Sequence, residues 1–249
     1  MPDAPGWNAG AAPAAVGGRL LAVLACAVSV PAEAQTWGGS IGLASDNVYR
    51  GISLDEGHPA WLADLHVEFA PGWVAGTDAA AERSQTHALG AQFDLYLDRR
   101  WRLDDDWAAK LGVLHYDSNW VRYDQVVAAI GYRGRWTGSI AASPNAGRDV
   151  PGTPAHHGTA LWAETTLHQP IAGPVAADFG FGYADVARVG GRNYRYANAG
   201  IDVVHGSLSF YLSRMWTSPI TYSYPELYGE VIARSHLRWL AVVTWSFPE

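Results

Sequence analysis

Acidic and histidine side chains recur at every second position in some apolar segments, and Asp64, His66 and Glu68 show this most clearly. A carboxylate, an imidazole and a second carboxylate on one face can move protons, hold a metal ion or attract cations. The residues between and around them, within 61–69, are apolar. Because the period is two, a β-strand would place the polar groups on one face and the apolar groups on the other.

Segments that alternate in this way recur along the chain and must position such groups. We expect strands at residues 38–50, 59–70, 73–79, 87–98, 107–117, 123–133, 136–143, 159–169, 175–185, 194–204, 207–216 and 231–247. Tight turns such as Ala70-Pro71-Gly72 alternate with longer links such as 144–158. This rhythm is typical of a transmembrane β-barrel. We therefore predict an all-β fold, an antiparallel up-and-down barrel of about twelve strands, with both chain ends at the short turns.

Aromatic residues fit the same map. The chain has 12 Trp and 12 Tyr. Trp73, Trp107 and Trp136 each follow a short turn, where a membrane barrel carries one aromatic girdle. A second girdle is expected near the long links, from Tyr49, Trp61, Tyr116, Tyr123, Tyr183, Tyr194 and Trp216.

The N-terminal segment has the features of a secretory signal. An apolar run, Leu20 to Val30, follows Arg19, and Ala32-Glu33-Ala34 has the form of a cleavage site. We predict a cleaved signal peptide at residues 1–34 and a barrel at residues 35–249. The single cysteine, Cys26, lies in the apolar run, so the mature chain would contain none. A lipoprotein signal with Cys26 lipidated is the alternative.

Composition and motifs exclude several other functions. The net charge is −7 and no basic cluster occurs, so no nucleic-acid partner is predicted. Adjacent histidines such as His156-His157 point apart in an extended chain, and no nucleophile–base set or phosphate-binding glycine motif is specified. We predict no catalytic residue, cofactor or metal. A secreted β-sandwich with a sugar-binding surface is a third class, but it does not predict charges on one strand parity.

One region resembles a known family. The segment Ser45–Ser53, with Gly57-His58-Pro59-Ala60, resembles the signature of the TorF-type porins of proteobacteria. Residues 93–97 and 111–116 are similar to two later strands of that family, although Ala91-Gln92-Phe93 departs from its pattern. The resemblance implies a barrel in the outer membrane of a Gram-negative bacterium and a porin role. The last strand, 239–247, resembles the signature that the barrel-assembly machinery recognises.

The polar parity of the strands would line the lumen if the apolar parity meets outer-membrane lipid. The expected lumen residues are Asp46, Arg50, Asp64, His66, Glu68, Asp94, Lys110, Glu164, Asp178 and Asp202. In one interpretation this acidic lining passes small solutes and favours cations. In the other, the same charges hold a closed barrel together, and its long loops bind a ligand or partner. Arg50 is either a pore charge facing Asp46 or Asp64, or an ion pair that anchors the first loop.

Overall fold

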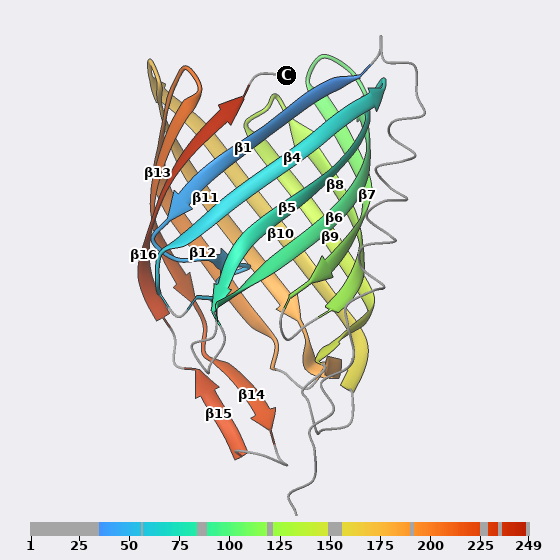
Figure 1. Ribbon diagram of the computed structural model, residues 1–249, viewed down its shortest axis with the longest axis vertical. Coiled ribbons are helices and arrows are strands. Elements are labelled where there is room, and N and C mark those ends of the chain that lie inside the picture. Colours follow the sequence, from blue (N-terminus) through green and yellow to red (C-terminus); the bar gives the residue numbers. More distant parts are fainter. Residues whose placement is uncertain are drawn as a thin grey trace, which may run out of the picture.

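Twelve strands close into one antiparallel barrel in the computed structural model of the chain (Figure 1). The structure describes residues 35–55, 57–83, 89–118, 122–148, 156–189, 192–224, 229–233 and 236–247. The barrel strands are β1 (Thr36–Ala44), β4 (Ala60–Ala70), β5 (Trp73–Arg83), β6 (Leu89–Arg102), β7 (Trp107–Asp117), β8 (Arg122–Tyr132), β9 (Trp136–Arg148), β10 (His156–Ala172), β11 (Val175–Asp185), β12 (Tyr194–His205), β13 (Leu208–Thr217) and β16 (His236–Phe247). The predicted fold class is therefore confirmed.

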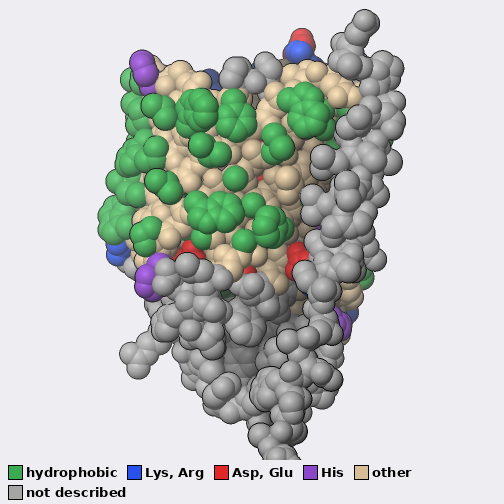
Figure 2. All heavy atoms as spheres, in the orientation of Figure 1, with side chains coloured by type: hydrophobic (Ala, Val, Ile, Leu, Met, Phe, Trp, Pro, Cys, Tyr) green, Lys and Arg blue, Asp and Glu red, His purple; other side chains and the backbone are tan. Residues whose placement is uncertain are grey.

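Each strand pairs with its neighbours in the chain, and β1 pairs with β16 to close the sheet. That seam runs from Gly39 opposite Phe247 to Ala44 opposite Val242. Large apolar side chains of one parity point away from the lumen; Leu43 is 68% exposed and Ile140 is 64% exposed. On the face drawn in Figure 2, apolar side chains are spread over the outer wall. Closure leaves no free sheet edge, which is what a sheet surrounded by lipid requires.

The two ends of the barrel differ as the rhythm of the links predicted. The short turns, the start of β1 and the end of β16 all lie at one end of the barrel, at the top of Figure 1. The longer links lie at the other, which we call the loop end. There, a separate hairpin of β14 (Ile220–Tyr224) and β15 (Gly229–Ala233) extends away from the barrel. A short 3-10 helix, η2 (Ala187–Val189), follows β11. In the described ranges, no helix has the length and apolarity needed to cross a membrane.

Several expected strand boundaries were wrong. Strand β5 continues to Arg83, beyond the expected end at 79, and β6 continues to Arg102, beyond the expected end at 98. Strands β9 and β10 extend well into the expected loop at 144–158, because they pair as far as Arg148 opposite His156. The expected last strand at 231–247 is divided between β15 and β16. The expected first strand at 38–50 ends at Ala44, and the chain then turns into the lumen. Residues 1–34, including Cys26, lie outside the described residues.

The expected second girdle was also partly wrong. Trp61 and Trp216 are exposed on the outer wall, but Tyr116, Tyr123 and Tyr194 are almost fully buried inside the barrel. Register explains the difference, because Tyr116 pairs with Asp94 and with Tyr123, on the lumen parity. Aromatic type and position near a strand end therefore did not distinguish lipid-facing from lumen-facing rings.

Candidate functional site

A small hairpin from the first long link enters the lumen. It consists of β2 (Val48–Tyr49) and β3 (Ile52–Ser53), and we call residues 48–53 the lumen hairpin. Its turn residues Arg50 and Gly51 have φ of 49° and 79°. Positive φ at both turn positions suits a two-residue hairpin, but it is uncommon for a residue other than glycine. The surrounding contacts hold Arg50 in this backbone conformation.

The Arg50 side chain crosses to the opposite wall. Its Nη2 donates to Gln125 Oε1 on β8 at 3.1 Å, and its Nε lies 3.7 Å from Glu164 Oε2 on β10. The guanidinium also stacks over the ring of Trp162, 4.3 Å from its centroid. Only 9% of the side chain is exposed. The partner of Arg50 is thus Glu164, and neither Asp46 nor Asp64.

The tip and the base of the lumen hairpin have further attachments. Thr217 Oγ1 on β13 donates to the Gly51 carbonyl at 2.7 Å. At the base, Asp46 accepts from Ser53 Oγ at 2.7 Å and pairs with Arg238 on β16. Asn47 Nδ2 donates to the Ala81 carbonyl on β5 at 2.9 Å. These contacts reach strands on several sides of the barrel, so the lumen hairpin narrows the lumen near the loop end.

An aromatic cluster fills the lumen on one side of the lumen hairpin. Its large buried members come from β7, β8, β10 and β12, and they are Tyr116, Tyr123, Trp162, Tyr194 and Tyr196. Tyr49 and Ile52 of the hairpin pack against them. The rings of Tyr116 and Tyr123 stack with centroids 4.7 Å apart. This packing occupies the β7–β12 side at the loop end, and the β4–β6 side carries acidic side chains, so we call it the polar wall.

Three aspartates form a row on that polar wall, which we call the acid row. Asp64 on β4 is directly opposite Asp78 on β5, and Asp78 is directly opposite Asp94 on β6. Asp64 also contacts His66 Nδ1 at 2.7 Å and accepts from the Tyr96 hydroxyl at 3.0 Å. Neighbouring strands lie about 4.8 Å apart, so three like charges are held close together.

The turn-end half of the lumen carries more charged groups. Lys110 lies 3.4 Å from Asp98, and Glu68 accepts from the Gly72 amide at 2.9 Å. His168 Nδ1 lies 2.8 Å from Asp178 Oδ1. With Asp202, these two form a group whose possible ligand atoms all lie within 4.8 Å of one another. His168 Nδ1 and Asp178 Oδ1 are already hydrogen-bonded to each other.

Eight of the ten expected lumen residues therefore lie on the inner face of barrel strands, while Asp46 and Arg50 lie on the inserted loop. Sequence reasoning missed several lumen residues, namely Asp78, Glu82, Asp98, Arg100 and Arg238. Asp78 could have been predicted from the sequence, because Trp73, Ala75 and Thr77 alternate with it and mark the outward face of the strand. Some charges do face outward near the loop end, where His115 pairs with Asp124 and Arg122 pairs with Asp117.

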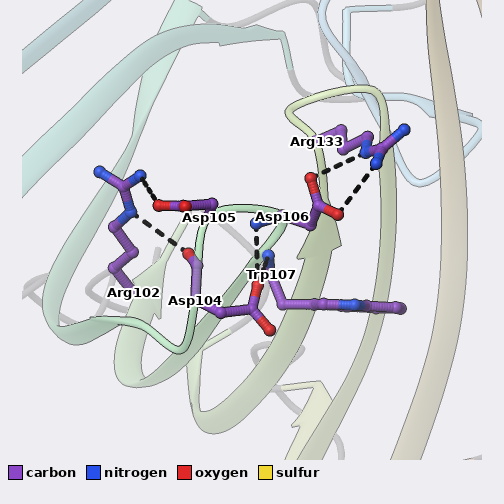
Figure 3. Close-up of polar contacts among 6 residues, drawn as sticks. All are labelled: Arg102, Asp104, Asp105, Asp106, Trp107 and Arg133. Atoms are coloured by element: carbon purple, nitrogen blue, oxygen red, sulfur yellow. Dashed lines mark hydrogen bonds and ion pairs between the residues drawn. The ribbon is translucent and has the colours of Figure 1, made fainter.

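Figure 3 shows the polar contacts that fix the turn between β6 and β7. Asp104 Oδ1 accepts from the amides of Asp106 and Trp107, both at 2.8 Å. Asp106 receives two hydrogen bonds from Arg133 in the next turn, at 2.8 and 3.0 Å. These bonds lower the pKa of Asp106 below its usual value. The turns border an open cleft of about 730 Å³ in which every arginine has a partner or a nearby acid.

Replacing Arg133 tests this arrangement. We expect Arg133→Ala to raise the pKa of Asp106 toward the ordinary aspartate value, because both stabilising hydrogen bonds are lost. Carboxyl NMR titration in detergent measures it. Arg135→Ala in the same turn is the control. An unchanged titration of Asp106 in Arg133→Ala would contradict the contact.

Two glycines with similar backbone angles separate packing from conformation. Gly51 and Gly57 have φ of 79° and 83°, so alanine costs about 1–2 kcal/mol of conformational energy at either position. At Gly51 a Cβ would lie 2.6 Å from Tyr196 Cβ, whereas at Gly57 nothing lies within 4 Å. We expect Gly51→Ala to cost a further ~1–3 kcal/mol by overpacking. Hydrogen exchange of the hairpin amides should be faster in Gly51→Ala than in Gly57→Ala, and equal exchange would contradict the insertion.

Comparison with known proteins gives matches in structure only: no family model and no curated protein sequence matches the chain. A structure from a study of in-meso crystallisation of membrane proteins has a TM-score of 0.53 at 9% identity, over 85% of this chain and 83% of that one. A KdgM porin in complex with disordered oligogalacturonate has a TM-score of 0.50 at 8% identity, over 86% of this chain and 100% of that one. An outer membrane channel from Pseudomonas putida F1 has a TM-score of 0.49 at 8% identity, over 87% and 99%. At these identities the likeness to the first two of these structures supports the barrel fold alone.

Proposed function

We propose that the chain is an outer-membrane channel that passes small solutes and prefers cations. The observation that carries this proposal is the asymmetric lumen at the level of the lumen hairpin. Aromatic side chains fill the β7–β12 side, while the acid row lines the β4–β6 side. A narrow path bordered by carboxylates attracts cations and repels anions.

The charge of the whole lining supports the preference. The described lumen acids are Asp46, Asp64, Glu68, Asp78, Glu82, Asp94, Asp98, Glu164, Asp178 and Asp202. The described lumen bases are Arg50, Arg100, Lys110 and Arg238. Three of these bases are paired with acids, and the remaining acids outnumber the remaining base, so the net charge of the described lining is negative.

The KdgM porin was solved with oligogalacturonate, which is an acidic sugar chain. An acidic lumen is poorly suited to such a polyanion, because like charges repel most strongly in a narrow, weakly screened path. We therefore propose cationic or neutral small solutes for this chain instead.

A second candidate is a closed barrel whose loops bind a ligand or partner. The observation in its favour is the number of attachments of the lumen hairpin and its base. They extend from the bond between Asn47 and Ala81 on β5 to the bond between Gly51 and Thr217 on β13. Twelve strands lie between the filled eight-stranded barrel and the open sixteen-stranded pore, so strand number favours neither.

Three further expectations belong to this proposal. The TorF-type resemblance rests mainly on residues 45–53, and these residues form the lumen hairpin and its base. Their contacts give a physical reason for an aromatic-Arg-Gly-x-Ser segment. We also propose export through the signal peptide at 1–34, and insertion into outer-membrane lipid after the barrel-assembly machinery recognises residues 239–247.

Planar-bilayer recording of refolded protein tests the channel against the closed barrel. We expect single-channel currents and, in a KCl gradient, a reversal potential of the sign for cation preference. Heat-modifiable migration on a gel is the control for folding. Absence of current from folded protein would favour the closed barrel, and anion preference would contradict the role of the acid row.

A further inference from the structure

The acid row contains an unusual buried atom. Asp94 is only 6% exposed, and its Oδ2 accepts from Gln92 Nε2 at 3.0 Å. Its Oδ1 is buried and has no hydrogen-bond partner among the described residues. A buried carboxylate oxygen without a donor is costly, and in native proteins such an atom commonly marks a bound water or ion.

The neighbours of Asp94 favour an ion of positive charge. Asp78 is directly opposite on β5 and brings a second carboxylate from the same face. Asp78 is in turn directly opposite Asp64 on β4, so the neighbouring position on this wall is also acidic. On β7, the partner opposite Asp94 is Tyr116, which brings no charge to neutralise the acids. The fixed positive charge acting on Asp94 is Arg50, which is already paired with Glu164.

Strand geometry allows one ion to bridge the two carboxylates. Neighbouring strands are about 4.8 Å apart. Directly opposite residues have Cβ atoms about 4.5–5.5 Å apart, so one ion can reach both carboxylates, and Ca²⁺ takes oxygen ligands at 2.3–2.6 Å. Asp78 is partly exposed, so waters from the lumen can supply the remaining ligands from its side.

We propose that Asp78 and Asp94 form a calcium-binding site on the lumen wall, at the level of the lumen hairpin. The site rests on the proposed function in one respect, namely that the lumen is open to water. Bound Ca²⁺ neutralises part of the acid row and so reduces the preference for monovalent cations. Two carboxylates with water ligands place the affinity in the weak range of extracellular calcium modules, about 10⁻⁴–10⁻³ M.

The test is calcium binding to the refolded full chain, measured by isothermal titration calorimetry with CaCl₂ alone. We expect Asp94→Asn to weaken binding at least about tenfold, because a charged ligand and the unpartnered oxygen are both changed. Asp98→Asn is the matched control. Asp98 lies on the same strand and face and is also 6% exposed, but its carboxylate is 3.4 Å from Lys110.

Current recording provides the second measurement. Millimolar CaCl₂ should reduce the K⁺ current of the wild type and of Asp98→Asn, and affect Asp94→Asn much less. Unchanged calcium binding in folded Asp94→Asn, or no binding to the wild type, would overturn the site. Calcium binding that depends on Asp94 in a protein without current would retain the site and reject the channel.

Discussion

Removal of the lumen hairpin should raise the single-channel conductance severalfold. Ala44 and Ala60 are paired across β1 and β4, so a short Asn-Gly turn can replace residues 45–59 without a change of register. The variant loses the contacts of Arg50 with Gln125 and Glu164 and leaves space beside the aromatic cluster. Conductance then rises because the narrowest part of the path has been widened.

The matched control removes the hairpin of β14 and β15, which lies outside the lumen. Thr217 and His236 are paired across β13 and β16, so residues 218–235 can be replaced by the same turn. Because β14 and β15 extend away from the barrel in Figure 1, this variant should conduct nearly as the wild type does. If trimming 45–59 leaves conductance unchanged in a folded, heat-modifiable barrel, the lumen hairpin does not limit the path.

Neutralising the acid row should abolish most of the cation preference. In the triple variant Asp64→Asn, Asp78→Asn and Asp94→Asn, the polar wall keeps its shape but loses its charge. The reversal potential in a KCl gradient should move toward zero, and the change should be largest at low salt, where the Debye length exceeds about 10 Å. Planar-bilayer recording at several salt concentrations measures both effects.

The control removes the same number of acids from the outer face. The three acids are Asp117, Asp124 and Asp185. Asp117 is opposite the exposed Phe93, and Asp185 is opposite the exposed Leu161. Asp124 is opposite His115, which also faces outward. Their triple replacement by asparagine changes the net charge of the protein equally. An equal loss of selectivity in both triple variants would show that overall charge, and not the acid row, sets the preference.

Alternation of apolar and polar residues was enough to predict the barrel, because each strand must separate lipid from lumen. The parity of Asp64, His66 and Glu68 also followed directly from Trp61 and Leu65, which are exposed on the outer wall. Such local patterns depend only on the period of a strand. They therefore survive errors of a few residues in strand boundaries.

The site itself depends on contacts that no local pattern contains. Arg50 meets Glu164 across the lumen, far away in sequence, and the first strand ends six residues before Arg50. The sequence predicted that Tyr116 and Tyr123 belong to the aromatic girdle, but the pairing of β7 with its neighbours puts both rings on the lumen face. The row of Asp64, Asp78 and Asp94 likewise appears only when the register of three strands is known.

Chemical modification of a cysteine introduced in place of Asp78 tests most directly whether the acid row lines the conducting path. Cys26 lies in the predicted signal peptide, so Asp78→Cys in a chain from residue 35 has one thiol. A positively charged methanethiosulfonate reagent should reduce the current of Asp78→Cys within one recording. Thr77→Cys, the neighbouring position on the outward parity, should not respond. No change at Asp78→Cys, or an equal change at Thr77→Cys, would contradict a water-filled path along β4, β5 and β6.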